Sequence, residues 1–177
     1  MSNSFDELVS VMARLRAPGG CPWDREQDWA SIAPHTIEEA YELADAIARG
    51  EPEAVRDELG DVLFQVVFQA RIAEERGLFD FDAVAASIAD KLERRHPHVF
   101  ADAKIEDSAA QTQAWEQHKR AERVARGQGV GALDGVTLGL PALIRAAKLG
   151  SRAAKVGFDW ADAGGVIAKV REELGEL

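Results

Sequence analysis

The chain has 177 residues, which is long enough for one sizeable hydrophobic core, or for one domain and part of another. Its formal net charge of −10 argues against a duplex nucleic acid as partner, because such binding needs a basic surface. The chain has a single cysteine, Cys21, and no apolar run long enough to cross a bilayer. Residues 1–7 have neither the basic nor the apolar segment of a signal peptide. These features predict a cytoplasmic protein without membrane contact.

The first predicted element is a helix over residues 5–15. Apolar residues recur there at helical spacing, namely Phe5, Leu8, Val9, Met12 and Leu15. The run 17–22, rich in Pro and Gly, ends it. A polar loop is expected next, with two large aromatic residues, Trp23 and Trp29. These residues either plug the end of a helical core or form the wall of a ligand pocket.

The second predicted helix begins at Thr36, a good N-cap residue, and Glu39 completes a capping box with it. The helix is expected to end at residues 49–52. Glu38 and Glu42 lie on one face of it together with Glu39, because positions three and four residues apart are neighbours on a helix. The cap accounts for Glu39 alone and leaves the other two carboxylates without a structural role.

The third predicted helix begins near Glu53 and is apolar on nearly every face as far as residue 70. A helix of this kind must be buried on nearly every side, which favours a helix bundle completed by a second copy of the chain. Glu58 and Asp61 lie one turn apart on it. Repulsion between clustered carboxylates calls for a cation, and ligand sets made only of oxygen suit Mg²⁺ or Mn²⁺ better than zinc.

A fourth helix is predicted over residues 81–95, with Val84, Ile88 and Leu92 facing inward. Its last turn carries the densest basic group of the chain, which consists of Lys91, Arg94 and Arg95. These cations either complement the helix dipole or clamp phosphate groups opposite the metal site. A further helix, over residues 109–126, carries Trp115, His118 and Lys119.

Two more helices are predicted after residue 133, over residues 141–148 and 166–177. The last one contains Glu172, Glu173 and Glu176, which repeat the spacing of Glu38, Glu39 and Glu42. In both places a Trp/Asp loop precedes the three carboxylates. This repeat indicates an internal duplication. Since the sequence has no second counterpart of the pair Glu58 and Asp61, we expect the second copy to be incomplete as given.

These residues resemble the MazG branch of the all-α nucleoside triphosphate pyrophosphohydrolases. The pattern Glu38-Glu39-x-x-Glu42 followed by Glu58-x-x-Asp61 is similar to the signature of that superfamily, which several enzyme classes share. Three flanking segments make the resemblance to the MazG branch specific: residues 19–24, 58–65 and 93–100. Residues 155–160 and 169–177 resemble the opening of a second MazG domain.

The resemblance implies an all-α fold of the four-helix-bundle type, completed by homodimerisation. It also implies hydrolysis of nucleoside triphosphates to the monophosphate and pyrophosphate, in the housecleaning of nucleotide pools, with Mg²⁺ as the expected ion and Mn²⁺ as an alternative. The implied domain boundaries are a MazG-like domain at 1–126, a linker at 127–141 and an incomplete second domain at 142–177.

The resemblance also implies roles for individual residues. The implied metal ligands are Glu39, Glu42, Glu58, Asp61, Glu173 and Glu176. Glu38 and Glu39 are the implied catalytic residues, with Glu38 as a ligand or as the base for water. The implied contacts to the phosphates or the nucleotide are Lys91, Arg94, Arg95, Trp115, Lys119 and Lys169.

Other functions compete with this interpretation. A di-iron carboxylate bundle needs paired Glu-x-x-His motifs, and only Glu93 to His96 fits. A P-loop nucleotide hydrolase is excluded because the Gly-rich loop followed by Lys and Ser or Thr is missing. A non-catalytic helical dimerisation or nucleotide-binding module stays open, as does a pyrophosphohydrolase for one particular nucleotide; indifference to metal chelation would identify the module.

Overall fold

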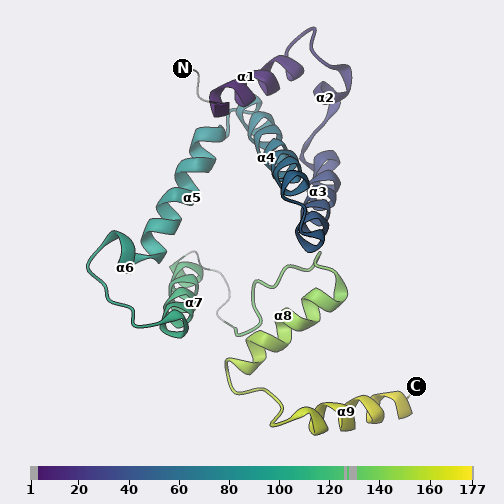
Figure 1. Ribbon diagram of the computed structural model, residues 1–177, viewed down its shortest axis with the longest axis vertical. Helices are drawn as coiled ribbons and strands as arrows, with labels where there is room; N and C mark the ends of the chain where they lie inside the picture. Colours follow the sequence, from purple (N-terminus) through teal and green to yellow (C-terminus); the bar gives the residue numbers. More distant parts are fainter. Residues whose placement is uncertain (1–3, 126, 128–130, 177) are drawn as a thin grey trace. The chain divides into compact units, whose positions relative to one another are not determined.

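Every regular element is a helix in the computed structural model of the chain, which describes residues 4–125, 127 and 131–176 (Figure 1). The all-α prediction is therefore confirmed. The chain divides into two compact units, Met1–Ala101 and Asp102–Leu177. Among the described helices, none combines the length and the apolar character needed to span a membrane.

The first unit opens with α1, Ser4–Arg16, as its apolar spacing predicts. The next element is a short helix, α2, Pro22–Glu26, in the segment that was predicted as a loop. Pro22 occupies the first turn of α2, where its fixed φ suits a helix and its missing N–H costs nothing. The loop prediction was therefore wrong for these five residues.

The acidic segment belongs to a longer helix than predicted, α3, Trp29–Arg49. Its N-cap is Asp28, whose side chain accepts a hydrogen bond from the Ser31 N–H at 2.9 Å, while the Ser31 hydroxyl accepts one from the Asp28 N–H at 2.9 Å. The predicted start at Thr36 was wrong, because this residue lies inside the helix and donates its hydroxyl to the Ile32 carbonyl at 3.3 Å. Glu39 consequently has no capping role.

α3 ends at Gly50, which adopts a left-handed φ of 69°, and α4, Pro52–Glu75, begins immediately after it. A glycine suits this position because a Cβ disfavours the left-handed region. The two helices form a tight hairpin (Figure 1). Their apolar residues join α1 in the core of the unit, which contains Met12, Ile32, Val67, Phe68 and Ile72.

The fourth long helix, α5, Phe81–Arg95, has the predicted bounds, and the short helix α6, Pro97–Phe100, follows it. The Asp80 side chain caps α5 by accepting from the Ala83 N–H at 2.8 Å. Val84 is half-buried, but Ile88 and Leu92 are 47% and 42% exposed, so the prediction that both face inward was wrong for the single chain. Figure 1 shows the reason, because α5 runs away from the hairpin after its first turns.

Burial of α4 also differs from the prediction. Its second half is buried at Val67, Phe68 and Ala70, whereas Leu59 and Val66 are exposed. Within one chain this helix is therefore covered on one side only.

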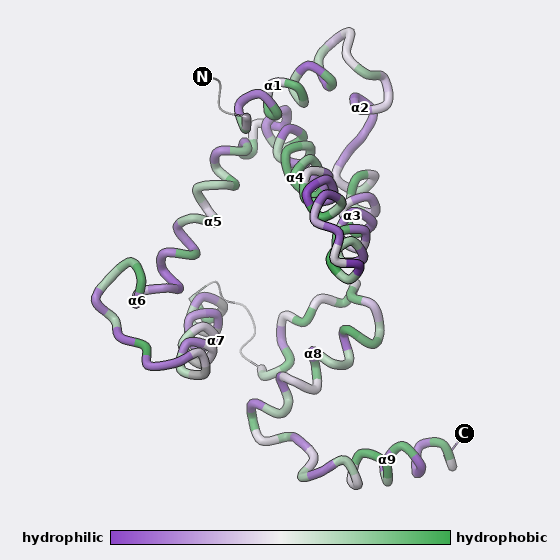
Figure 2. The backbone as a smooth tube through the Cα atoms, viewed as in Figure 1, coloured by the Kyte–Doolittle hydropathy of each residue, from purple (hydrophilic) through white to green (hydrophobic). Residues whose placement is uncertain are grey.

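The second unit contains α7, Ser108–Ala125, α8, Ala142–Ala154, and α9, Ala163–Gly175. Helices were predicted in all three places. Hydrophobic and hydrophilic residues alternate along α9 (Figure 2), and large apolar side chains such as Leu143 and Phe158 are exposed. Residues 126, 128–130 and 177, at the ends of the predicted domains and in the predicted linker, lie outside the described residues, and the boundaries at 126 and 141 stay a prediction.

Candidate metal centre

Three carboxylates of the first unit converge on one point of the α3–α4 hairpin. Glu39 comes from α3, and Glu58 and Asp61 come from α4; one ligand oxygen of each lies within 4.8 Å of the others. The tight turn at Gly50 brings the C-terminal half of α3 against the N-terminal half of α4. The spacing of Glu58 and Asp61 then places both on the side facing Glu39. We refer to these three residues as the carboxylate trio.

The trio is electrostatically unbalanced. Burial raises the pKa of the Glu39 carboxyl, and the negative charges of Asp61, Glu42, Glu58 and Glu38 raise it further. In the part of the chain that the structure describes, no trio member makes an ion pair with a basic side chain. Ionisation of Glu39 is therefore less favourable than that of an ordinary glutamate, and a bound cation would offset the repulsion.

The donor set of the trio fits a hard divalent cation. All its ligand atoms are carboxylate oxygens, which are suitable ligands for Mg²⁺ and Mn²⁺. Zinc and copper sites usually include nitrogen or sulfur ligands as well. Within the described residues, the trio has no His or Cys among its members. The raised pKa of Glu39 agrees with a site made for a positive charge.

The other two predicted carboxylates of α3 lie beside the trio. Glu42 and Glu58 line a shallow hollow of about 370 Å³ together with Tyr41, Asp45 and Arg49. Glu38 is mostly exposed, and its carboxylate lies 3.6 Å from Nδ1 of His35. Sequence reasoning missed His35 as a neighbour of the site, although its i,i+3 spacing to Glu38 was a signal.

The basic group of α5 has its own local environment. Arg94 forms an ion pair with Asp90 of its own helix, and Arg95 is buried. Neither they nor Lys91 line the hollow beside Glu42 and Glu58. Their predicted role as a phosphate clamp stays a prediction.

The second acidic motif has its own local geometry in the second unit. Nζ of Lys169 lies 2.6 Å from Glu172 and 3.0 Å from Glu173, and both carboxylates raise the pKa of the lysine. A hollow of about 650 Å³ is lined by Trp160, Val166, Lys169, Val170, Glu173, Leu174 and Glu176. The predicted site residues Lys169, Glu173 and Glu176 thus lie together.

The two remaining predicted nucleotide contacts lie on α7. Lys119 forms an ion pair with Glu116 at 3.2 Å, and Trp115 is half-buried on the same helix. Neither residue is placed relative to the carboxylate trio, because they belong to the second unit.

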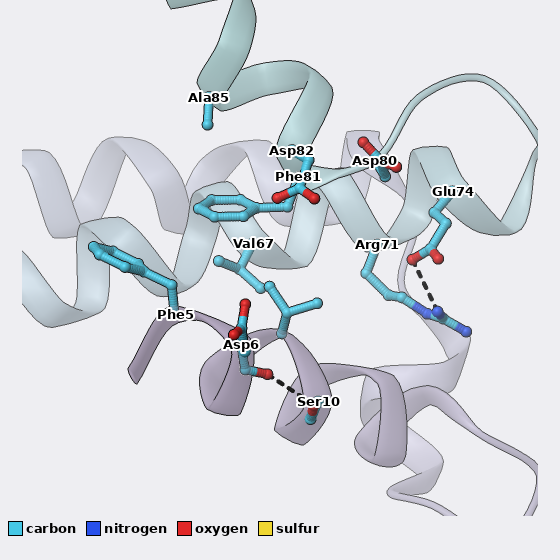
Figure 3. A pocket seen from close by; sticks show the side chains of 11 residues that line it. Phe5, Asp6, Ser10, Val67, Arg71, Glu74, Asp80, Phe81, Asp82 and Ala85 are labelled. Atoms are coloured by element: carbon cyan, nitrogen blue, oxygen red, sulfur yellow. Dashed lines mark hydrogen bonds and ion pairs between the residues drawn. The ribbon is translucent and has the colours of Figure 1, made fainter. Parts of the chain in front are cut away.

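Another cavity of the first unit contains none of the predicted site residues. It has a volume of about 500 Å³ and lies between α1, α4 and the start of α5 (Figure 3). Phe5, Val67 and Phe81 supply its apolar wall, and Arg71 is paired with Glu74 at 2.9 Å on its rim. This cavity is a gap in the packing of α5 against the hairpin.

Neutralising one carboxylate of the trio is expected to stabilise the metal-free protein. The pKa of Glu39 is raised in the folded state, which means that its ionised form opposes folding. The free energy of unfolding is therefore reduced at neutral pH, and it recovers as the pH falls through the raised pKa. Glu39→Gln should therefore raise the melting temperature in EDTA at pH 7 by about 2 °C.

Addition of 5 mM Mg²⁺ should stabilise the wild type and leave Glu39→Gln almost unchanged. Thermal unfolding monitored by circular dichroism measures both effects. Glu51→Gln is a suitable control because Glu51 pairs with Arg49 outside the trio. If Mg²⁺ raises the melting temperatures of Glu39→Gln and Glu51→Gln equally, the ion binds elsewhere.

Comparison with known proteins agrees with the geometry. The sequence profile of the MazG nucleotide pyrophosphohydrolase domain matches residues 27–100, which include the trio. The chain is 54% identical over 176 residues to a nucleoside triphosphate pyrophosphohydrolase of Escherichia coli K12, covering 99% of this chain and 66% of the relative.

Two further relatives extend this comparison. The chain is 44% identical over 174 residues to the nucleoside triphosphate pyrophosphohydrolase/pyrophosphatase MazG of Thermotoga maritima, covering 98% of this chain and 66% of the relative. It is 41% identical over 156 residues to a nucleoside triphosphate pyrophosphohydrolase of Mycobacterium tuberculosis, covering 86% of this chain and 45% of the relative. With the profile match over the carboxylate trio, these identities show that the chain belongs to the MazG family of nucleotide pyrophosphohydrolases.

Proposed function

We propose that the chain hydrolyses nucleoside triphosphates between the α and β phosphorus atoms, giving a nucleoside monophosphate and pyrophosphate. The observation that carries the proposal is the carboxylate trio, which accumulates negative charge without an internal cation among the described residues. The activities for which the E. coli and T. maritima relatives are named support it. The chain spans about two thirds of the length of both, so this activity is a proposal for the chain by itself.

The proposed cofactor is Mg²⁺, with Mn²⁺ as an alternative. Glu39, Glu58 and Asp61 would hold it, and Glu42 lies next to Glu58 as a further ligand. A bound divalent cation supplies the positive charge that lets a polyanionic substrate approach five carboxylates and that stabilises the leaving pyrophosphate.

Glu38 is our proposed base. It lies on the neighbouring face of α3, outside the trio, and its exposed carboxylate is open to water. In the proposed reaction a water oxygen attacks the α phosphorus, the bond from that phosphorus to the bridging oxygen breaks, and Glu38 accepts the proton of the water. Lys91, Arg94, Arg95, Trp115, Lys119 and Lys169 are the proposed contacts to the nucleotide, and Glu173 and Glu176 the proposed ligands of a second site.

We also infer that a second copy of the chain completes the fold. Large apolar side chains are exposed on three helices of the first unit, namely Ile37 and Tyr41 on α3, Leu59 and Val66 on α4, and Ile88 and Leu92 on α5. This many exposed large apolar side chains on three helices of one unit favour an obligate interface. The single reduced cysteine is in keeping with the proposed cytoplasmic location.

The test is an analysis of products. The protein is incubated with each common ribonucleoside and deoxyribonucleoside triphosphate, with Mg²⁺ or with EDTA, and the products are separated by ion exchange. Nucleoside monophosphate and pyrophosphate, formed only with metal, are the expected result. A nucleoside diphosphate and phosphate would move the attack to the γ phosphorus and overturn the proposal. Absence of any product would favour the non-catalytic module.

A further inference from the structure

Trp23 presents a partly exposed indole ring next to His35, which precedes Glu39 by one turn of α3. Trp23 is 50% exposed. Its two aromatic neighbours meet it nearly at right angles, with interplanar angles of 69° to His35 and 83° to the buried Phe68. Among the described residues, no aromatic ring lies parallel to this indole, and no protein acceptor takes its N–H. The ring therefore keeps open both its surface and a hydrogen-bond donor.

Trp29, in the same stretch of sequence, has a different environment. Its N–H donates to the Gln69 carbonyl at 3.1 Å. Phe79 stacks against its ring at an interplanar angle of 15°, and the Arg76 guanidinium lies 4.7 Å from its centroid. The N–H group and the ring of this indole are both held by neighbours in the fold, which makes Trp29 the structural residue of the two.

Hydrogen bonds from two side chains hold α2, the short helix that carries Trp23. Gln27 donates its side-chain amide to the Trp23 carbonyl at 2.9 Å. The buried Arg16 guanidinium donates to the carbonyls of Asp24 and Gln27, and it lies over the Phe68 ring, 5.3 Å from the centroid. An exposed aromatic ring on such a fixed support binds a flat partner at little cost in conformational entropy.

Two short contacts link Trp23 to the carboxylates of α3. The centroids of the Trp23 and His35 rings are 5.9 Å apart, and His35 lies 3.6 Å from Glu38. Glu39 follows His35 by four residues, which on a helix is one turn, ~6 Å, on the same face. The indole and the trio are thus separated by a span that the sugar and phosphates of one nucleotide can bridge.

We propose that Trp23 is the residue on which the base of the nucleotide stacks, while the phosphates lie at the carboxylate trio. This inference rests on the proposed function and extends it from the triphosphate to the base. Stacking on an aromatic side chain accepts every base, because each has a π face, and it favours the larger purines. Trp23 would therefore give affinity for nucleosides in general and a preference for purines.

The experiment compares substrates with and without a base. Values of kcat and KM are measured for ATP, CTP and ribose 5-triphosphate, for the wild type, Trp23→Phe and Trp23→Ala. Trp23→Ala should raise the KM for ATP about 10-fold or more, and that for CTP less, with kcat almost unchanged. The KM for ribose 5-triphosphate should stay the same, and Trp23→Phe should retain part of the affinity for ATP.

Trp29→Phe is the matched control. It should lower the melting temperature and leave the ratio of KM for ribose 5-triphosphate to KM for ATP unchanged, since Trp29 is packed inside the fold. If Trp23→Ala changes all three substrates equally, its role is structural and the inference is wrong. If Trp23→Ala changes all three substrates equally, and Trp115→Ala lowers the ratio of KM for ribose 5-triphosphate to KM for ATP, the base stacks on Trp115 instead.

A binding measurement separates this inference from the proposed reaction. Equilibrium binding of AMP and of ribose 5-phosphate to the wild type and Trp23→Phe, followed by calorimetry in Mg²⁺, needs no turnover. An inactive wild type that binds AMP more tightly than ribose 5-phosphate, with the difference reduced in Trp23→Phe, would overturn the reaction and support the stacking. Equal binding of the two ligands by the wild type would overturn the stacking whatever the activity.

Discussion

Asp61→Asn is expected to reduce the release of pyrophosphate from nucleoside triphosphates by about 100-fold or more, with the fold intact. Asp61 supplies one of three carboxylates whose oxygens lie within 4.8 Å of each other. Mutation of a residue that only orients a metal ligand already lowers metal affinity or activity ~10- to 100-fold. Removing the charge of a ligand itself should therefore lower activity by about 100-fold or more. Asparagine keeps the size of the side chain and removes the charge.

The control for this change lies on the same helix. Asp57 is exposed, and its carboxylate pairs with Arg56 at 2.9 Å rather than with the trio. Asp57→Asn makes the same chemical change one turn earlier and should retain full activity. Circular dichroism should give both variants the helix content of the wild type, and Mn²⁺ binding followed by electron paramagnetic resonance should weaken in Asp61→Asn alone. Equal activity in the two variants would show that the carboxylates of α4 are ordinary surface charges.

Helical spacing in the sequence predicted one carboxylate cluster on each helix, and the resemblance to the MazG branch implied Glu39, Glu42, Glu58 and Asp61 as ligands. Spacing alone could not separate Glu39 from Glu38. Neighbouring residues on a helix point about 100° apart, so only one of them can face α4, and the position of α4 decides which one. The structure places Glu39 toward Glu58 and Asp61, and leaves Glu38 exposed beside His35.

The start of α3 was mispredicted because two capping boxes compete in the sequence. Thr36 with Glu39 and Asp28 with Ser31 both satisfy the local pattern. Packing decides between them, since Trp29 on the first turn is held by Gln69 and Arg76 of the α4 region. The exposure of Ile88 and Leu92 has a similar origin, because periodicity identifies an apolar face but does not say which surface covers it.

Arg16 is expected to contribute more to stability than any other charged side chain of α1. Its side chain is 6% exposed and donates from Nε and Nη2 to the Glu75 carboxylate, with the shortest hydrogen bond at 2.7 Å, in addition to its bonds to the α2 segment. Arg16→Met fills the space with an apolar chain but leaves Glu75 and two backbone carbonyls without this donor. Because Glu75 is 29% exposed and keeps Arg71, we expect a loss of ~2–3 kcal/mol, or ~10 °C in melting temperature.

The pH dependence identifies the cause of this loss. The hydrogen bonds from Arg16 are the main reason why the pKa of Glu75 lies below its ordinary value of 4.5. Because the pKa of Glu75 is lowered in the folded state, its ionised carboxylate stabilises the protein fully above the ordinary pKa. This stabilisation disappears as the pH falls through the lowered pKa. The difference in unfolding free energy between wild type and Arg16→Met, measured by urea denaturation, should therefore be constant above pH 5 and shrink in more acidic solution.

Arg14→Met provides the comparison, because Arg14 is exposed on the same helix and its loss should change stability by less than ~0.5 kcal/mol. A difference between wild type and Arg16→Met that stays the same down to pH 3 would mean that the backbone carbonyls and the Phe68 ring, rather than Glu75, hold Arg16 in place. In either case α2, the short helix that carries Trp23, depends on this arginine, so the stability of the first unit and the position of the indole are coupled through one buried side chain.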